Sequence, residues 1–335
     1  MPSAQPKHNH MKGALFGMFI GDALAMPVHW YYDREALMRD YGRVTEYLAP
    51  KNPHPDSILW RSSYTPPNRS ADILHDQAQY WGRRDIHYHQ FLKAGENTLN
   101  IKLAREWLIM IGRDRFYSSE SWLKRLVDFM TTPGTHRDTY IEEYLRHFFT
   151  AYGKGEPLAD CGRKDENHIG GLALFLPVLI VFSQDRAHAR KIALQHLGLT
   201  HGGPAMVRGG RLIANILLDV LHGVSLKDAI LSRDIYSQQL EPLMDYQDLV
   251  VVGRHFSPAC YLQESIPATL YLAMKYANYP SEALIANTMC GGDNAGRGAV
   301  LGALLGAFHG MAAWPEHWVH GLVDPPPIPD FLGRI

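Results

Sequence analysis

The feature that most constrains the fold is the stretch CGGDNAGRGAVLGALLGA at residues 290–307. Its glycines at positions 298, 302 and 306 are four residues apart, so on a helix they form one row. Each glycine inside a helix costs about 0.5–1 kcal/mol relative to alanine. Three of them in one row therefore predict that another backbone comes very close to this helix.

The start of the same stretch indicates a sharp turn that presents polar side chains. Gly291 and Gly292 allow the chain to turn, and Asp293 is a favoured N-cap acceptor for the helix that follows. Asn294 and Arg297 come directly after it. The pattern predicts an acid and an amide directed into a pocket, although a capped, buried helix without a functional role explains the same residues equally well.

Residues 11–25, MKGALFGMFIGDALA, repeat the small-residue pattern and are also predicted to be a helix. Asp22 lies on this apolar segment, where a buried acid needs a partner. It either bonds the backbone amides of a neighbouring turn or belongs to a ligand site. The helix ends near Pro27, and His29 opens an aromatic cluster that suits a pocket wall or a corner of the core.

The amino-acid composition limits which classes of binding partner and which cellular location are expected. The chain has 335 residues, 46% of them hydrophobic, with 33 basic and 34 acidic residues. This balance gives no electrostatic reason to expect nucleic acid or an anionic membrane as a partner. Three cysteines without CxxC spacing favour a reducing, cytoplasmic location. The polar residues 1–10 are predicted to be a disordered tail, without the apolar region of a signal peptide.

The rest of the chain reads as helices joined by glycine-rich turns. Residues 40–84 form a long loop or lid docked by aromatic side chains, and LVVVG at residues 249–253 is the one candidate strand. No alternating strand–helix rhythm, dinucleotide-binding glycine motif or P-loop is present. We therefore predict a single compact all-α domain at residues 11–335.

Several of the helix starts carry polar or glycine residues that suit a site. Glu96 and Asn97 precede an apolar helix, where the dipole stabilises an acid even without a functional role. Gly170 and Gly171 open another apolar helix and can expose amides to an anion. His201 lies in the turn THGGP.

The pair His87 and His89 places two imidazoles close together in an HxH motif. A zinc site requires about two further ligands in reach, and none is near in the sequence. The motif on its own is therefore a weak indication of zinc.

Three stretches together resemble the ADP-ribosylglycohydrolase superfamily, which also includes crystallin-like members. They are GDALAMPVHW in the first helix, THGGP at residues 200–204, and GGDNAGRGAVLGALLGA. Their order and spacing cover nearly the whole chain. The resemblance implies a compact all-α bundle, with an active site between these turns that acts on ADP-ribosyl groups.

The family usually holds two Mg²⁺ ions, and the positions that match its ligands differ in this chain. The family's first set of metal ligands falls on Gly95, Glu96 and Asn97 of this chain. Its last set begins at Asp293, but the second acid of that set is absent here. An acid of the family falls on His29. Two ions need more carboxylates than remain, so the resemblance implies at most one Mg²⁺, on Glu96, Asn97 and Asp293, or none.

Two functions follow as hypotheses. The first is hydrolysis of an N- or O-glycosidic bond to ADP-ribose or a related ribosyl group, with Glu96 and Asp293 as the catalytic carboxylates. The second is a non-catalytic ligand-binding or crystallin-like structural protein on the same fold. Retained polar side chains favour the enzyme, and the substrate would be a small molecule or an ADP-ribosylated partner. The residues expected to bind it are Asp22, His29, Asn97, Gly170, Gly171, His201, Asn294 and Arg297.

Overall fold

The computed structural model describes residues 5–233 and 238–333, and these fold as helices around a central antiparallel pair. Within these residues, β-pairing is limited to isolated bridges between single residues. The predicted all-α class is therefore confirmed. The helices are α1 (His8–Ala25), α2 (Arg34–Tyr41), α3 (Leu99–Asp114), α4 (Ser119–Thr131), α5 (Glu143–Gly153), α6 (Gly170–Val181), α7 (Arg186–Gly198), α8 (Pro204–Leu221), α9 (Leu226–Leu231), α11 (Asp248–Val250), α12 (Leu262–Lys275), α13 (Pro280–Met289), α14 (Asn294–His309) and α15 (Glu316–Gly321).

The central pair is α1 and α14, and the two glycine rows are the surfaces that meet. A Cβ on Gly302 would lie 2.0 Å from the carbonyl oxygen of Gly17, and one on Gly306 would lie 2.0 Å from that of Gly13. The backbone contact predicted from glycine spacing is therefore confirmed, and the partner of each row is the other row. Helix α1 is apolar and long enough to pass a membrane-span test, but nearly all of it is buried inside the fold, as in a core helix.

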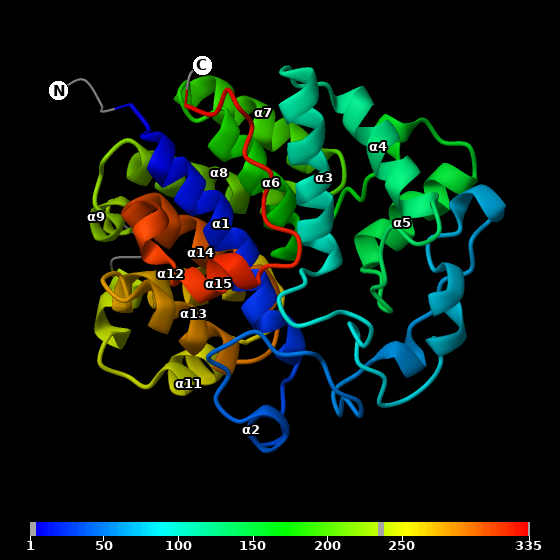
Figure 1. The fold of residues 1–335 in the computed structure, drawn as a ribbon, viewed down its shortest axis with the longest axis horizontal. Helices are drawn as coiled ribbons and strands as arrows, with labels where there is room; N and C mark the ends of the chain where they lie inside the picture. Colours follow the sequence, from blue (N-terminus) through cyan, green and yellow to red (C-terminus); the bar gives the residue numbers. More distant parts are fainter. Residues whose placement is uncertain (1–4, 234–237, 334–335) are drawn as a thin grey trace.

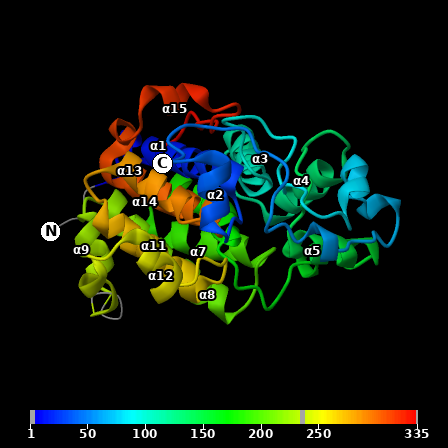
Figure 2. The same ribbon diagram turned by 90° about the horizontal axis from the view of Figure 1, so that it is seen from below.

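The other helices surround this pair. Helix α6 is buried over its whole length and packs beside α3 and α7, while α12 and α13 contact α14 from the other side. Figures 1 and 2 show α4 and α5 at one end of the molecule and α9, α11, α12 and α13 at the other. Connecting segments between these groups of helices supply the polar residues discussed below.

The segment at residues 43–98 has no α-helix and contains only short 3₁₀ turns. Aromatic side chains attach it to the helical body, as predicted. Trp81 donates its indole N–H to the carbonyl of Thr139 at 2.9 Å, and the hydroxyl of Tyr47 donates to the carbonyl of Trp318 at 2.9 Å. A role for this segment as a lid stays a prediction.

Two local predictions were wrong. The candidate strand at residues 249–253 forms the end of α11 and a π-type turn, Val251–His255, because no strand among the described residues lies beside it to form a ladder. The predicted disordered tail at residues 1–10 is too long, since α1 already begins at His8. Residues 1–4 of that tail lie outside the described residues.

Candidate active site

A pocket lined mainly by aromatic side chains opens where several connecting segments meet. Its volume is about 360 Å³. We call it the aromatic pocket. It is defined by Trp30, Tyr32, Tyr88, Tyr140 and Tyr261, together with Glu142, His168 and Cys260.

Trp30 is held in the wall of this pocket by an unusual backbone conformation. Its φ of 63° lies in the left-handed region, which costs free energy for a bulky residue and often marks a functional site. Its N–H donates to the carbonyl of Gly292 at 2.8 Å, so the glycine turn fixes this conformation. The indole stacks on His29, with ring centroids 3.8 Å apart. The pocket therefore presents a flat aromatic surface supported by a histidine.

Glu142 is the acid of the pocket that sequence reasoning missed. It is the residue before α5, and its Oε1 accepts a hydrogen bond of 2.7 Å from the side-chain amide of Asn100. The hydroxyl of Tyr144 donates to the oxygen of the same amide and orients it. Burial, reinforced by the negative charge of Asp293, raises the pKa of Glu142 to about 8. At neutral pH this carboxyl therefore holds its proton.

Asp293 behaves in the opposite way. Its Oδ1 accepts from the backbone N–H of Gly296 at 3.0 Å, which confirms the predicted N-cap of α14. Burial opposes ionisation, but the hydrogen bond and charge of His29, with Arg297 nearby, hold the pKa of Asp293 below its usual value. Burial, together with the charge of Asp293, raises the pKa of Tyr32 and Cys260 in the pocket wall. The protonated Glu142 thus lines the pocket, whereas the ionised Asp293 is buried and acts on the pocket through its charge.

A chain of buried hydrogen bonds leads away from Asp293. His29 lies 3.1 Å from Asp293 Oδ1 and 2.9 Å from Nε2 of His89, whose Nδ1 lies 2.6 Å from Asp138 Oδ1. Each of the three bonds needs one proton, and two neutral imidazoles supply only two. The chain links the two carboxylates through two imidazoles, and burial lowers the pKa of His89 although Asp138 opposes this shift.

Glu96 lies at the far end of this network and not beside Asp293. Lys102 joins the two parts, with its Nζ 3.6 Å from Asp138 Oδ2 and 2.8 Å from Glu96 Oε1. Glu96 also pairs with Arg137 at 3.0 Å, and it lines a separate hollow of about 200 Å³. The prediction that Glu96 and Asp293 share one cavity was therefore wrong, because Glu96 lines a separate hollow, where Lys102 and Arg137 neutralise it.

The turn before α14 adopts the predicted sharp bend. Gly291 and Gly292 have φ values of 65° and 62°. A Cβ on either would clash, at 2.2 Å from the carbonyl of Tyr31 or 2.1 Å from that of Pro258. These glycines are thus required for the close approach of two chain segments that border the aromatic pocket.

Asn294 and Arg297 hold this turn together from inside. The amide of Asn294 donates to the carbonyls of Val28 and Thr288. Arg297 is fully buried and donates to Asn287 Oδ1 at 3.1 Å, as well as to the carbonyls of Pro258 and Gly291. Both side chains are engaged with the protein, which favours a positioning role over direct substrate contact.

Asp22 and Asn97 form a second internal cluster at the start of α3. Asp22 accepts from the amide of Asn97 at 2.7 Å and from the backbone N–H and hydroxyl of Thr98. Burial raises the pKa of Asp22 to about 6. Asp22 therefore bonds a neighbouring turn, which was one of the two predicted alternatives. This geometry does not support its predicted role in substrate binding.

Gly170 and Gly171 allow close packing behind the aromatic pocket. A Cβ on Gly170 would lie 2.9 Å from the amide of Asn100, and one on Gly171 would lie 2.7 Å from the ring of His201. His201 is buried against Tyr144, with ring centroids 4.0 Å apart. Burial lowers its pKa to about 4. The neutral ring of His201 thus supports the residues that hold Glu142.

His168 brings a positive charge into the pocket. Its Nδ1 lies 2.5 Å from Oε1 of Glu166. Burial disfavours the charged imidazole, but Cys260 and Glu166 outweigh burial and raise the pKa of His168 to about 11. An imidazolium therefore lies on the same wall as the neutral carboxyl of Glu142.

The missed residues gave little signal in the sequence. Glu142 lies in YIEEYL, which looks like an ordinary exposed helix start, and His168 is a single histidine two residues before the glycine pair at 170–171. His89 stood out in the HxH motif, but its partners are His29 and Asp138, 60 and 49 residues away. Only the fold brings these groups together.

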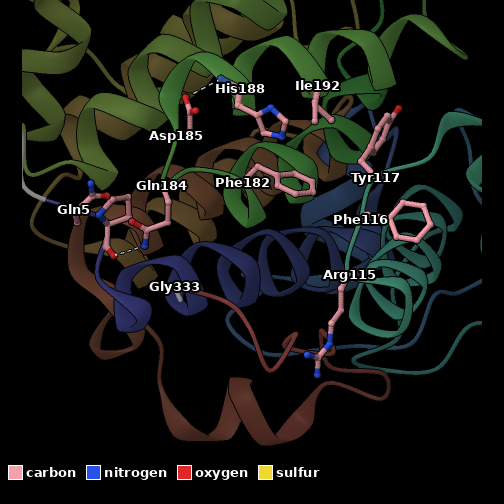
Figure 3. A pocket seen from close by; sticks show the side chains of 11 residues that line it. Gln5, Arg115, Phe116, Tyr117, Phe182, Gln184, Asp185, His188, Ile192 and Gly333 are labelled. Atoms are coloured by element: carbon pink, nitrogen blue, oxygen red, sulfur yellow. Dashed lines mark hydrogen bonds between the residues drawn. The ribbon is translucent and has the colours of Figure 1, made fainter. Parts of the chain in front are cut away.

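A larger hollow of about 840 Å³ lies elsewhere, between the N-terminal segment and α7 (Figure 3). Phe116, Tyr117 and Phe182 provide much of its surface. Asp185 is the one acid that lines it, and this carboxylate caps α7 by accepting from the N–H groups of Ala187 and His188. Because that acid is occupied structurally, the smaller aromatic pocket is the better candidate for chemistry.

Comparison with known proteins places the chain in a class. The family model for ADP-ribosylglycohydrolase matches residues 3–334. The chain therefore belongs to the ADP-ribosylglycohydrolase family, a family of hydrolases that act on ADP-ribosylated substrates.

A solved structure described as an ADP-ribosylglycohydrolase-related protein complex has the same fold. Its TM-score is 0.62 at 18% sequence identity, and the match covers 94% of this chain and 92% of that chain. A comparison with curated protein sequences gave no match. Family and fold together support a glycohydrolase-type function.

Proposed function

We propose that this protein hydrolyses an N- or O-glycosidic bond to ADP-ribose or a related ribosyl group in the aromatic pocket, without a metal ion. The observation that carries the proposal is the opposite ionisation of two carboxyls acting on one pocket. The pKa of Glu142 is raised to about 8, and that of Asp293 is lowered. Opposed pKa shifts of this kind define the acid and the anion of a glycosidase.

Each group has a separate task in this reaction. The protonated Glu142 donates its proton to the leaving-group oxygen or nitrogen as the glycosidic bond breaks. The ionised Asp293 stabilises the positive charge that develops on the ribosyl ring. Trp30 and Tyr261 offer faces for ring stacking, and Arg61 and the imidazolium of His168 provide charge for a phosphate group. In this proposal Glu142 takes the place of Glu96 as the second catalytic carboxyl, and it acts as an acid.

The residues predicted to bind Mg²⁺ do not fit a metal site. Glu96 pairs with Lys102 and Arg137, Asn97 binds Asp22, and Asp293 binds His29. Among the described residues, no group of three or more His, Cys, Asp or Glu side chains is arranged to hold a metal. Lys102 and Arg137 thus already balance Glu96, and an added divalent ion would have to displace them.

The second candidate, a non-catalytic or structural protein, is favoured by one specific observation. Four side chains predicted to bind substrate form their hydrogen bonds with other groups of the protein: Asp22, Asn97, Asn294 and Arg297. On this account the pocket is a remnant of the family's site, or it binds a ligand without cleaving it. A reducing, cytoplasmic location remains a prediction under either function.

Calorimetry with ADP-ribose in EDTA tests whether the aromatic pocket is a ligand site. We expect saturable binding that added Mg²⁺ leaves unchanged. Tyr261→Ala should weaken it by roughly two- to tenfold, because a stacking contact contributes about 0.5–1.5 kcal/mol. Tyr279→Ala is the matched control, since Tyr279 is also an exposed N-cap tyrosine, on α13 and outside the pocket.

Binding that appears only with Mg²⁺ would contradict the metal-free site. Absence of any binding to ADP-ribose would favour the structural protein.

A further inference from the structure

The separate hollow that Glu96 lines contains buried polar groups without partners. Its volume of about 200 Å³ is smaller than the ~300–1,000 Å³ of pockets that hold drug-sized ligands, so any ligand it takes is small. We call it the charged hollow. Its charged and titratable lining includes Glu96, Lys102, Arg105, Glu106, His136 and Arg137.

Two elements supply the hydrogen-bond donors of the charged hollow. Lys102 and Arg105 are three positions apart on α3, which places them on the same face of that helix. His136 and Arg137 lie in the segment that follows α4. Donors from a helix and from a connecting segment therefore converge on one small space.

Arg105 has a donor that the protein leaves unused. Its Nε is buried and has no hydrogen-bond partner among the described residues. Its ion-pair partner, Asp324, is half-exposed, and the carboxylate Oδ1 lies 3.9 Å from Nη2 of Arg105, which is beyond hydrogen-bonding distance. Because a guanidinium stays charged at any physiological pH, leaving a buried N–H without an acceptor is costly.

His136 is the second unused group. It is 6% exposed, and neither of its ring nitrogens has a partner in the described part of the chain. The rings of Phe129 and His75 hold it in place, with centroids 6.3 Å and 6.1 Å away. Burial lowers the pKa of His136 to about 4, so at neutral pH the ring is neutral and offers one N–H.

The buried acids of the charged hollow already have cationic partners. Glu96 pairs with Lys102 at 2.8 Å and with Arg137 at 3.0 Å. Glu106 accepts a hydrogen bond of 2.9 Å from Nε of Arg125. Among the described lining residues, Arg105 is thus the cation without a hydrogen-bonded carboxylate, and the missing partner is an anion.

We propose that the charged hollow binds a small oxyanion, a phosphate or a carboxylate group, whose oxygens accept hydrogen bonds from Arg105 and His136. Arg105 supplies the charge and a planar set of donors, which suits either group. His136 adds a directed N–H from the opposite element. This site is separate from the aromatic pocket and does not depend on the proposed glycosidase function.

Calorimetric titration of the full chain with inorganic phosphate and with acetate tests the proposal, in chloride buffers of matched ionic strength. We expect saturable binding of at least one of the two anions, and the tighter one identifies the class of ligand. Arg105→Gln and His136→Phe should each weaken this binding about tenfold or more, the effect of losing a hydrogen bond to a charged group.

Arg113→Gln is the matched control, because Arg113 is an exposed arginine of the same helix that pairs with Asp114 outside the hollow. It should leave the affinity unchanged. Thermal melts in chloride check that each variant is folded. In wild type, the anion that binds should raise the melting temperature, and this rise should be smaller in Arg105→Gln.

Binding of neither anion would overturn the proposal. So would an unchanged affinity in both folded variants, Arg105→Gln and His136→Phe. Loss of binding in Arg61→Gln but not in Arg105→Gln would place the anion in the aromatic pocket instead, because Arg61 lines that pocket. Since heat and melting temperature are the readouts, each result is independent of whether the protein hydrolyses a glycosidic bond.

Discussion

At the scale of single residues, the site depends on carboxyls that the fold places in different electrostatic surroundings. Glu142 is surrounded by an amide, aromatic rings and a neighbouring negative charge, so it keeps its proton. Asp293 and Asp138 each receive a hydrogen bond from an imidazole and stay ionised. All three side chains are carboxyls, so the groups around each one determine whether it is protonated or ionised.

Glu142 should make stability depend on pH in a specific direction. Its pKa in the folded protein, about 8, is above its ordinary value of 4.5, so folding favours the protonated form. The stability it contributes is full below about pH 4.5 and is lost as the pH rises toward 8. Glu142→Gln mimics the protonated acid and should not lose it. In urea unfolding, the free energy of unfolding of the variant relative to wild type should increase by at least about 1 kcal/mol from pH 5 to pH 8.

The exposed acid Glu120, on α4, provides the control, because Glu120→Gln should show no such gain. Parallel pH profiles for wild type and Glu142→Gln would show that Glu142 is not held protonated.

Asp138 should be required for the buried chain between His89 and Lys102. Its side chain is fully buried and ionised, with His89 at 2.6 Å. In Asp138→Asn, Lys102 loses a counter-charge and His89 loses the carboxylate at its Nδ1, and removing one partner of a buried pair costs about 3–5 kcal/mol. We expect a loss of that order in urea unfolding at pH 7. Asp128→Asn, in an exposed pair with Arg125, should change stability by less than about 1 kcal/mol. Equal effects of the two changes would show that the chain adds no stability.

At the scale of helices, the glycine rows of α1 and α14 set the distance between the two central elements. Gly302→Ala should be severely destabilising, because the new Cβ would lie 2.0 Å from the carbonyl of Gly17. The helix preference of alanine, about 1 kcal/mol, cannot offset this clash, so we expect a net loss of at least about 3 kcal/mol.

Gly112→Ala, in α3, is the matched control for this prediction. Nothing lies within 4 Å of its added Cβ, so it should stabilise the protein by about 0.4–1 kcal/mol. Thermal melts of both variants measure the contrast. If Gly302→Ala is as well tolerated as Gly112→Ala, the two helices are not in backbone contact.

The helices themselves were largely predictable, for a local physical reason. Glycine spacing, caps and apolar runs act within one or two turns, and they predicted the central helices and the N-cap at Asp293. The site was less predictable, because its contacts are made across the chain. Glu96 looked like a free acid at a helix start, but Lys102 and Arg137 neutralise it. Glu142 became an acid of interest only when Asn100 and Asp293 were placed around it.

At the scale of the whole molecule, this chain keeps the fold of its family and balances its acids with its own cations. Asp293, Asp138 and Glu96 alternate with histidine, lysine and arginine side chains along one connected network. The aromatic pocket lies at one end of this network and a small charged hollow at the other. Under the proposed function, the protein's own charges take the place of the metal ions that the family resemblance implies.

The most direct test of this account is the rate of ADP-ribose release from an ADP-ribosylated peptide in EDTA, for wild type and Glu142→Gln. We predict that wild type releases ADP-ribose without metal, that its rate falls as the pH rises through about 8, and that the variant is slower by roughly 100-fold or more. Release that requires added Mg²⁺, or that proceeds equally fast in Glu142→Gln, would contradict it.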